Sequence, residues 1–227
     1  MKLKQSKLSF RATRAGLGAL LLSGLLAATA QGAITTNIVF SVQPVSTVVG
    51  ASLGNVTIQL RDSRGTNAAL AGVAVNLSQS KGAGLTGTTV GVTDATGKAV
   101  FTNLVVTRYG LADALTAATT AYKTVVSSAF NITQGRTTTT VSAPTNGIYG
   151  QSLTLMAAVG LVSPAAGTPT GLVTFRDGSA ILGSNALTGT TSSFVITSRL
   201  LAGTHSFSAS YSGDTNFAAS TSAGFSV

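Results

Sequence analysis

The 227-residue chain contains no cysteine, no tryptophan and no glutamate, and it has a single histidine. Without cysteine there is no disulfide and no thiolate nucleophile, so the burial of apolar side chains has to hold the fold together. Charged residues make up 8% of the chain and aromatic residues 6%, which leaves few groups for acid–base chemistry or for stacking on a ligand. The composition therefore excludes a disulfide scaffold and a thiol enzyme. Its β-branched residues and 26 glycines favour short strands and turns.

The net charge of +9 is concentrated at the N-terminus. Five of the 14 basic residues lie within the first 14 positions, and without them nine basic residues remain against five aspartates, which gives +4. These nine are scattered singly along the chain. A protein that binds nucleic acid gathers its cations on one face, with aromatic stacking partners, so we expect no nucleic-acid partner.

Residues 1–30 are typical of a secretion signal. A basic start is followed by an apolar run from Ala15 to Ala28, and Ala28-Thr29-Ala30 has the small-residue pattern of a cleavage site. We expect cleavage after Ala30, with Gly32 or Ala33 as alternative last residues. An uncleaved anchor is the other interpretation, but the run is shorter than the roughly 20 apolar residues that a membrane span needs. The lack of a cysteine after the signal excludes a lipoprotein anchor.

Residues 34–133 show apolar residues that alternate with polar ones in short runs. Val56, Ile58 and Leu60 alternate in this way, which is the pattern of a half-buried strand. The pattern also predicts one strand over residues 99–106, whose Phe101 points inward, and Phe130 is expected to be a second inward ring. The glycine-rich residues 82–91 are predicted to be a loop. Seven short strands at this spacing predict a β-sandwich.

The strongest alternation of the chain lies at His205–Tyr211. The odd positions are large or apolar and the even positions are all serine, which predicts a strand with one buried face. Ser212-Gly213-Asp214 turns the chain back, and Asp177-Gly178 is a strong turn signal for an earlier hairpin. Residues 136–227 therefore predict a second sandwich. Its junction to the first, residues 134–136, is too short for a flexible tether.

Residues 200–217 read L-L-A-G-T-H-S-F-S-A-S-Y-S-G-D-T-N-F and resemble the signature of the group 3 bacterial Ig-like repeats. Tyr149-Gly150-Gln151 and Leu182-Gly183 extend the resemblance over residues 136–227. Residues 34–133 are more loosely similar to the invasin-type bacterial Ig-like domain, through V-F-S-V-Q-P, V-T-I-Q-L-R-D-S-R-G and T-D-A-T-G-K-A-V-F. The resemblance implies an all-β fold of two tandem Ig-like β-sandwiches, at 34–133 and 136–227, in a bacterial surface protein. It names no ligand.

No catalytic, cofactor-binding or metal-binding residue is predicted. His205 lies on the inward face of its strand beside Phe207, with no nucleophile to activate, so its expected role is structural. Four aspartates stand in turns, where a carboxylate caps its own backbone. These are Asp62, Asp94, Asp177 and Asp214. Calcium is the alternative, with Asp214 the first residue to test, but the ion wants about six to eight oxygens and residues 133–137 contain no acid.

The sequence thus predicts an exported, monomeric, non-catalytic protein at the bacterial cell surface or outside the cell. It would act as a stiff spacer or an adhesive module for an unidentified surface protein, matrix protein or glycan, and partners would dock at strand edges or loops. The alternative is a carbohydrate-binding accessory module of an extracellular enzyme. That function needs exposed aromatic rings, for which Tyr109 and Tyr122 are the candidates.

Overall fold

The computed structural model describes residues 35–81, 84–144, 151–197 and 200–227. These ranges contain twenty strands and no helix, which confirms the predicted all-β fold. None of the described residues forms a helix that is long and apolar enough to cross a membrane. The predicted secretion signal, residues 1–30, lies outside the described residues.

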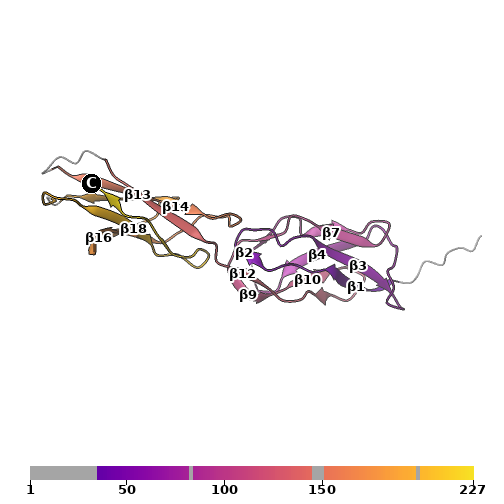
Figure 1. Ribbon diagram of the computed structural model, residues 1–227. Helices are drawn as coiled ribbons and strands as arrows, with labels where there is room; N and C mark the ends of the chain where they lie inside the picture. Colours follow the sequence, from indigo (N-terminus) through magenta and orange to yellow (C-terminus); the bar gives the residue numbers. More distant parts are fainter. Residues whose placement is uncertain (1–34, 82–83, 145–150, 198–199) are drawn as a thin grey trace, which may run out of the picture. The chain divides into compact units, whose positions relative to one another are not determined.

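Twelve strands between residues 35 and 133 form what we call the N-terminal sandwich, drawn in indigo to rose in Figure 1. They are β1 (Thr35–Val42), β2 (Thr47–Val48), β3 (Val56–Asp62), β4 (Ala74–Gln79), β5 (Leu85–Thr86), β6 (Val90–Val92), β7 (Lys98–Phe101), β8 (Val105–Val106), β9 (Gly110–Asp113), β10 (Leu115–Ala118), β11 (Val125–Val126) and β12 (Phe130–Thr133).

Two main sheets enclose the core of the N-terminal sandwich. One has the order β1-β3-β7 and the other β11-β10-β4-β6, with the smaller sheets β2-β12-β9 and β5-β8 beside them. On β4 the apolar Val75 and Leu77 are buried while their polar or small neighbours face out, as the alternation predicts. Phe101 and Phe130 are also buried, so both rings point inward as expected.

Three local predictions in this sandwich are wrong. β3 is buried on both faces and not on one, because Thr57 and Gln59 are buried as well as the apolar residues between which they lie. Residues 99–106 form two strands, β7 and β8, because Phe101 and Leu104 are both buried and a continuous strand cannot turn residues three apart to the same face. The glycine-rich residues 82–91 are not simply a loop. Leu85–Thr86 pairs with β8, and Val90–Val92 pairs with β4.

Eight strands between residues 137 and 226 form the C-terminal sandwich, the orange-to-yellow part of Figure 1. They are β13 (Thr137–Ser142), β14 (Leu153–Leu161), β15 (Leu172–Asp177), β16 (Ala180–Ala186), β17 (Thr191–Ile196), β18 (Ser206–Tyr211), β19 (Ser220–Thr221) and β20 (Phe225–Ser226).

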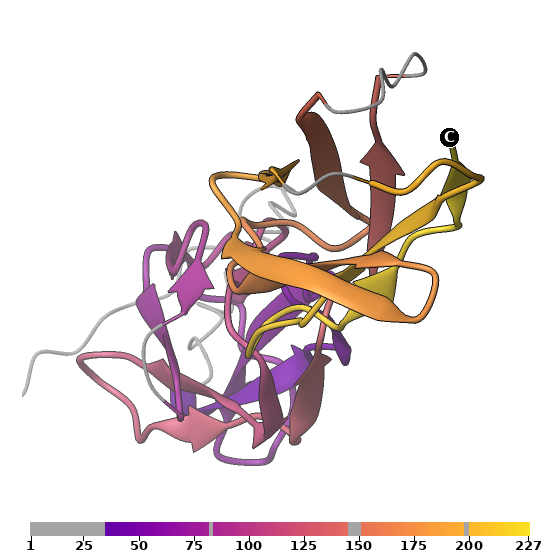
Figure 2. The same ribbon diagram turned by 90° about the vertical axis from the view of Figure 1, so that its left-hand side faces the viewer.

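One sheet of the C-terminal sandwich has the order β13-β14-β17 and the other β16-β15-β18-β19, with β20 also paired to β18. In Figure 2 the red-brown strands β13 and β14 belong to the first of these sheets and the yellow β18 belongs to the second. The alternation of β18 is confirmed, because Phe207, Ala209 and Tyr211 are buried. Opposite them, Phe175 of β15 is also fully buried, and this interior is the core of the sandwich.

Side chains join the edges of these two sheets. At one edge the Thr137 hydroxyl donates to the Ser220 hydroxyl at 2.7 Å, and the Thr139 and Ser220 hydroxyls are also 2.7 Å apart. This connects β13 to β19. At the other edge Asn185 of β16 donates through its Nδ2 to the Ser193 carbonyl of β17 at 2.6 Å. Each edge strand of one sheet is therefore joined by side-chain hydrogen bonds to an edge strand of the other.

Candidate functional site

The aspartates at two turns of the N-terminal sandwich cap their own backbones, as predicted. Asp62 Oδ1 accepts hydrogen bonds from the amides of Arg64 and Thr66 at 2.9 and 2.8 Å. Asp94 Oδ1 does the same for the amides two and four positions further on, at 2.7 and 3.1 Å. Hydrogen bonds, led by the hydroxyl of the nearby threonine, lower the pKa of each carboxyl. Both groups are therefore already satisfied and need no ligand.

Asp113 is the more deeply buried of the two buried aspartates of the N-terminal sandwich. The Ser80 hydroxyl donates to one of its oxygens at 3.0 Å, and the Gln79 amide donates to the other. Across the described residues, no three groups of the types that bind metals lie close enough together to hold an ion. The absence of a cofactor and of calcium dependence stays a prediction for a binding experiment.

Asp177 stands at the hairpin turn between β15 and β16, as predicted, but the prediction that its carboxylate caps its own turn is wrong. Asp177 Oδ2 lies 2.5 Å from His205 Nδ1, and Oδ1 accepts the Ser206 amide at 3.1 Å. His205 Nε2 lies 2.8 Å from the Leu201 carbonyl oxygen, and the ring stacks on Phe207 with 5.9 Å between centroids. The Leu201 carbonyl first, and then the Asp177 carboxylate, raise the pKa of His205.

His205 precedes the first residue of β18, and its contacts are of the kind that a structural role requires, which stays a prediction. The sequence analysis did not identify Asp177 as its partner. Both ring nitrogens face oxygens that can only accept, so both nitrogens must carry a proton to satisfy this geometry. In the protonated ring both nitrogens donate, so this form has no lone pair with which to act as a base. No sequence pattern indicates that His205 contacts Asp177, because Asp177 is 28 residues away at the end of another strand.

Asp214 organises the turn between β18 and β19 and the segment that enters β15. Its Oδ2 accepts the Thr170 amide at 2.7 Å, and its Oδ1 accepts the amides of Asn216 and Phe217 at 2.7 and 2.8 Å. Burial raises the pKa of Asp214, but these hydrogen bonds outweigh burial and hold the pKa below its usual value. The Asp214 turn is thus a closed hydrogen-bonded unit.

Tyr211 stabilises the same hydrogen-bonded turn. Its hydroxyl donates to the Thr170 carbonyl at 2.6 Å, and burial, followed by the charge of Asp214, raises the pKa of Tyr211 to about 12. The phenol therefore stays protonated and keeps donating at any ordinary pH. Thr170 thus accepts a hydrogen bond from Tyr211 through its carbonyl and donates one to Asp214 through its amide. The sequence analysis did not assign this role to it.

The Asp214 turn also holds the predicted junction, residues 134–136. The Gly135 amide donates to the Asn216 carbonyl at 2.9 Å, and the Ala218 amide donates to the Gly135 carbonyl at 2.9 Å. Gln134 Nε2 donates to the Asp214 carbonyl at 2.9 Å. Two consecutive junction residues are thereby tied to the C-terminal sandwich by backbone and side-chain hydrogen bonds.

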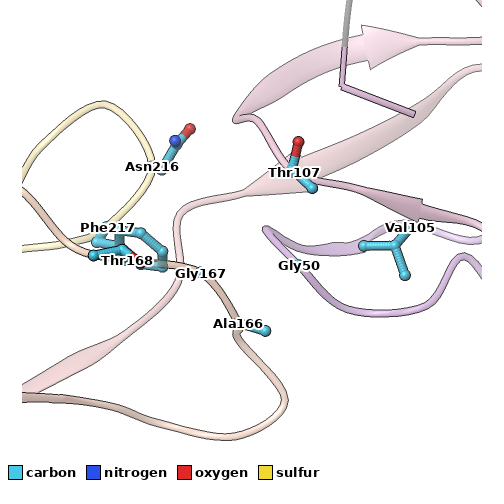
Figure 3. A pocket seen from close by; sticks show the side chains of 8 residues that line it. All are labelled: Gly50, Val105, Thr107, Ala166, Gly167, Thr168, Asn216 and Phe217. Atoms are coloured by element: carbon cyan, nitrogen blue, oxygen red, sulfur yellow. The ribbon is translucent and has the colours of Figure 1, made fainter. Parts of the chain in front are cut away.

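A hollow of about 370 Å³ lies beside this junction, lined by the eight residues in Figure 3. Its polar groups are the hydroxyls of Thr107 and Thr168 and the amide of Asn216. None of the eight side chains is titratable. The hollow can therefore offer hydrogen bonds to a neutral polar group, but it holds no acid, base or nucleophile of the kind that catalysis requires.

The two tyrosines proposed for sugar binding differ in how exposed their rings are. Tyr122 is half-buried and packs against the core, so its ring is part of the N-terminal sandwich. Tyr109 is 42% exposed, and it follows Arg108 and precedes the exposed Leu111. Of the two rings, Tyr109 is the one that can contact a ligand.

Comparison with known proteins finds that residues 137–227 match the bacterial Ig-like domain (group 3). This confirms the resemblance of the C-terminal sandwich. The match begins at the first residue of β13 and runs to the last residue of the chain. No curated protein matches the chain.

Three solved structures are similar to this chain. The adhesin InvE of Yersinia pseudotuberculosis is 14% identical with a TM-score of 0.40, over 78% of this chain and 56% of that one. The D0-D1 domain of intimin is 18% identical with a TM-score of 0.33, over 85% and 97%. The fibronectin(III)-like modules of Clostridium thermocellum CbhA are 13% identical with a TM-score of 0.31, over 84% and 91%. The chain thus spans little more than half of the InvE structure.

Proposed function

From the membership of residues 137–227 in the bacterial Ig-like domain family (group 3), we propose that the chain is a non-catalytic exported module. It serves as a stiff spacer or adhesive module at the bacterial cell surface or outside the cell. The proposal includes the division into two independently folding domains, 34–133 and 136–227. In the described residues every strand ladder joins strands on the same side of residues 134–136.

The observation that carries the spacer function is the way Gln134 and Gly135 are held. A short junction transmits position only if its backbone cannot rotate freely, and here both residues are hydrogen-bonded to the Asp214 turn. The residues that make this turn, Gly213-Asp214-Thr215-Asn216-Phe217, belong to the family signature. The signature thus supports a fixed junction as well as a folded sandwich.

The chemistry of the described residues supports a function without catalysis. The carboxylates accept hydrogen bonds from hydroxyls, amides and one histidine, and the histidine ring has no free nitrogen. The hollow of Figure 3 contains no titratable side chain. Stable hydrogen-bonded turns are what a structural module needs, because they keep loops ordered without a ligand.

Small-angle scattering on residues 31–227 tests the spacer function. We expect an elongated particle, and Asp214→Asn should broaden the distribution of dimensions by weakening the turn that holds the junction. Asp94→Asn is the matched control, because it removes the same kind of cap from a turn away from residues 134–136. A compact globule, or equal broadening in both variants, contradicts a fixed junction.

Mass spectrometry tests the export of the chain. Secreted material should begin at Gln31, after the predicted cleavage site. Recovery of the chain in the cytoplasm with its N-terminal residues intact contradicts export, whatever the scattering experiment shows.

A further inference from the structure

The cations and the carboxylates of the described residues differ in the interactions that they make within the protein. The carboxylates are all hydrogen-bonded within the protein, and the ion pair of His205 with Asp177 is the only one in the described ranges. The lysines and arginines of these ranges therefore form no ion pair. They remain able to contact a negatively charged partner, and their positions decide where such a partner would bind.

Two of these cations lie in or beside the backbone segment that carries Tyr109, the one exposed tyrosine of the described ranges. Lys81 Nζ donates to the Leu111 carbonyl at 2.8 Å, which brings the lysine beside that segment. Arg108 precedes Tyr109, and its side chain packs close to Gly84. We call Lys81, Arg108, Tyr109 and Leu111 the Tyr109 surface. All four are exposed.

The backbone below the Tyr109 surface is held in place by several separate segments. The Thr107 amide donates to the Gly84 carbonyl at 2.9 Å, and the Tyr109 amide donates to Asn216 Oδ1 at 3.0 Å. The Ala112 amide donates to Asn131 Oδ1 at 2.8 Å. Because the segment is already ordered, a ligand that binds its side chains pays little to fix the backbone.

No carboxylate of the described residues forms an ion pair with the cations of the Tyr109 surface. The carboxylate nearest in the chain is that of Asp113, which is 1% exposed and is bonded to Ser80 and Gln79. The guanidinium of Arg108 can therefore present its paired N–H groups to an external carboxylate, which is the group that matches its geometry best. The next residue along the chain, Tyr109, is 42% exposed, and its ring offers an apolar face with a polar edge.

We propose that the Tyr109 surface binds an acidic polysaccharide whose sugar rings carry carboxylate groups. A sugar ring stacks on Tyr109, while Arg108 and Lys81 pair with its carboxylates. The hydroxyls and the amide of the neighbouring hollow, which includes Thr107, then face the neutral hydroxyls of the same polymer (Figure 3). Nucleic acid fits less well, because it requires a longer stripe of cations than these two.

This proposal deepens the adhesive part of the proposed function and rests on it. Calorimetry of the mature chain with polygalacturonate, dextran and duplex DNA tests it. We expect binding to polygalacturonate that weakens as salt rises, and no binding to the uncharged dextran. Equal binding to dextran, binding to DNA as tight as to polygalacturonate, or no binding at all each overturns the proposal.

Substitutions test whether the polysaccharide binds at the Tyr109 surface. Tyr109→Ala and Arg108→Gln should each weaken binding by about tenfold or more, which is the loss of one good contact. Tyr109→Phe keeps the ring and should retain binding within a few fold. The matched controls, Ile181→Ala and Arg64→Gln, change an exposed apolar residue and an exposed arginine elsewhere and should leave binding unchanged. Binding that survives both Tyr109→Ala and Arg108→Gln refutes the site, while the scattering result on the spacer stands or falls separately.

Discussion

Raising the pH from about 5 to about 9 should destabilise the C-terminal sandwich through His205. The imidazolium donates to Asp177 and to the Leu201 carbonyl, and these contacts raise its folded pKa. The unfolded pKa is about 6.5. The stabilisation is therefore fully present below about pH 6 and is lost as the pH rises through the folded pKa.

The size of the effect follows from the contacts that deprotonation removes. A neutral ring keeps one proton, so one of its two hydrogen bonds is lost and an acceptor faces an acceptor. Hydrogen bonds to charged groups contribute about 1.5–3 kcal/mol, and the His205 side chain is 20% exposed, which favours the lower part of this range. We expect a loss of about 1–2 kcal/mol. In a unit of this size that corresponds to roughly 5–10 °C in Tm.

Thermal melts across the pH range, with His205→Gln as the comparison, measure this loss. Glutamine cannot take up a proton, so the variant should show a flatter dependence and melt near the high-pH wild type. Because the chain has one histidine, its ring protons give an unambiguous NMR titration. A midpoint at or below about 6.5, or the same pH dependence in His205→Gln, refutes the reasoning.

Three further predictions concern packing and metal. Phe207→Ala should cost about 3–5 kcal/mol in denaturant unfolding, because the ring is fully buried, and a loss below about 1 kcal/mol contradicts that burial. Gly97→Ala should be much more destabilising than Gly65→Ala. Both glycines have a positive φ, but a Cβ on Gly97 would lie 1.9 Å from the Ala68 carbonyl oxygen while Gly65 has open space, so equal melting temperatures would contradict the close approach. Calcium or a chelator should leave Tm unchanged, and a rise of several degrees with calcium would show a site that the carboxylate contacts do not suggest.

The alternation of apolar and polar side chains predicts a strand correctly where one face of the strand is buried and the other face lies in water. It located the buried face of β18, because a strand with one face in water repeats every two residues. It failed at residues 99–106, where Phe101 and Leu104 must both enter the core. It also failed at residues 85–92, where glycines obscure two short strands that exist only because β8 and β4 lie beside them. Pairing partners distant in the chain are not encoded in a local pattern.

The same limit applies to the functional side chains. The sequence placed Asp214 in a turn correctly, since its partners are two and three residues away. It could not find the partner of His205 or distinguish Tyr109 from Tyr122, because exposure of a ring depends on what packs over it. The exposed ring and its two cations were therefore visible only once the fold had brought residues 81 and 108–111 together.

The hydroxyl contacts between sheet edges have a consequence for aggregation. A row of free backbone amides and carbonyls invites the same row on another molecule, and such contacts grow into extended aggregates. In the C-terminal sandwich Thr137, Thr139 and Ser220 turn one edge strand towards its own neighbour. The same threonine hydroxyls also donate to the Ala218 and Ser220 carbonyls, so part of the backbone at this edge is hydrogen-bonded within the molecule and is not open to another strand. Threonine and serine thus close this edge without a disulfide.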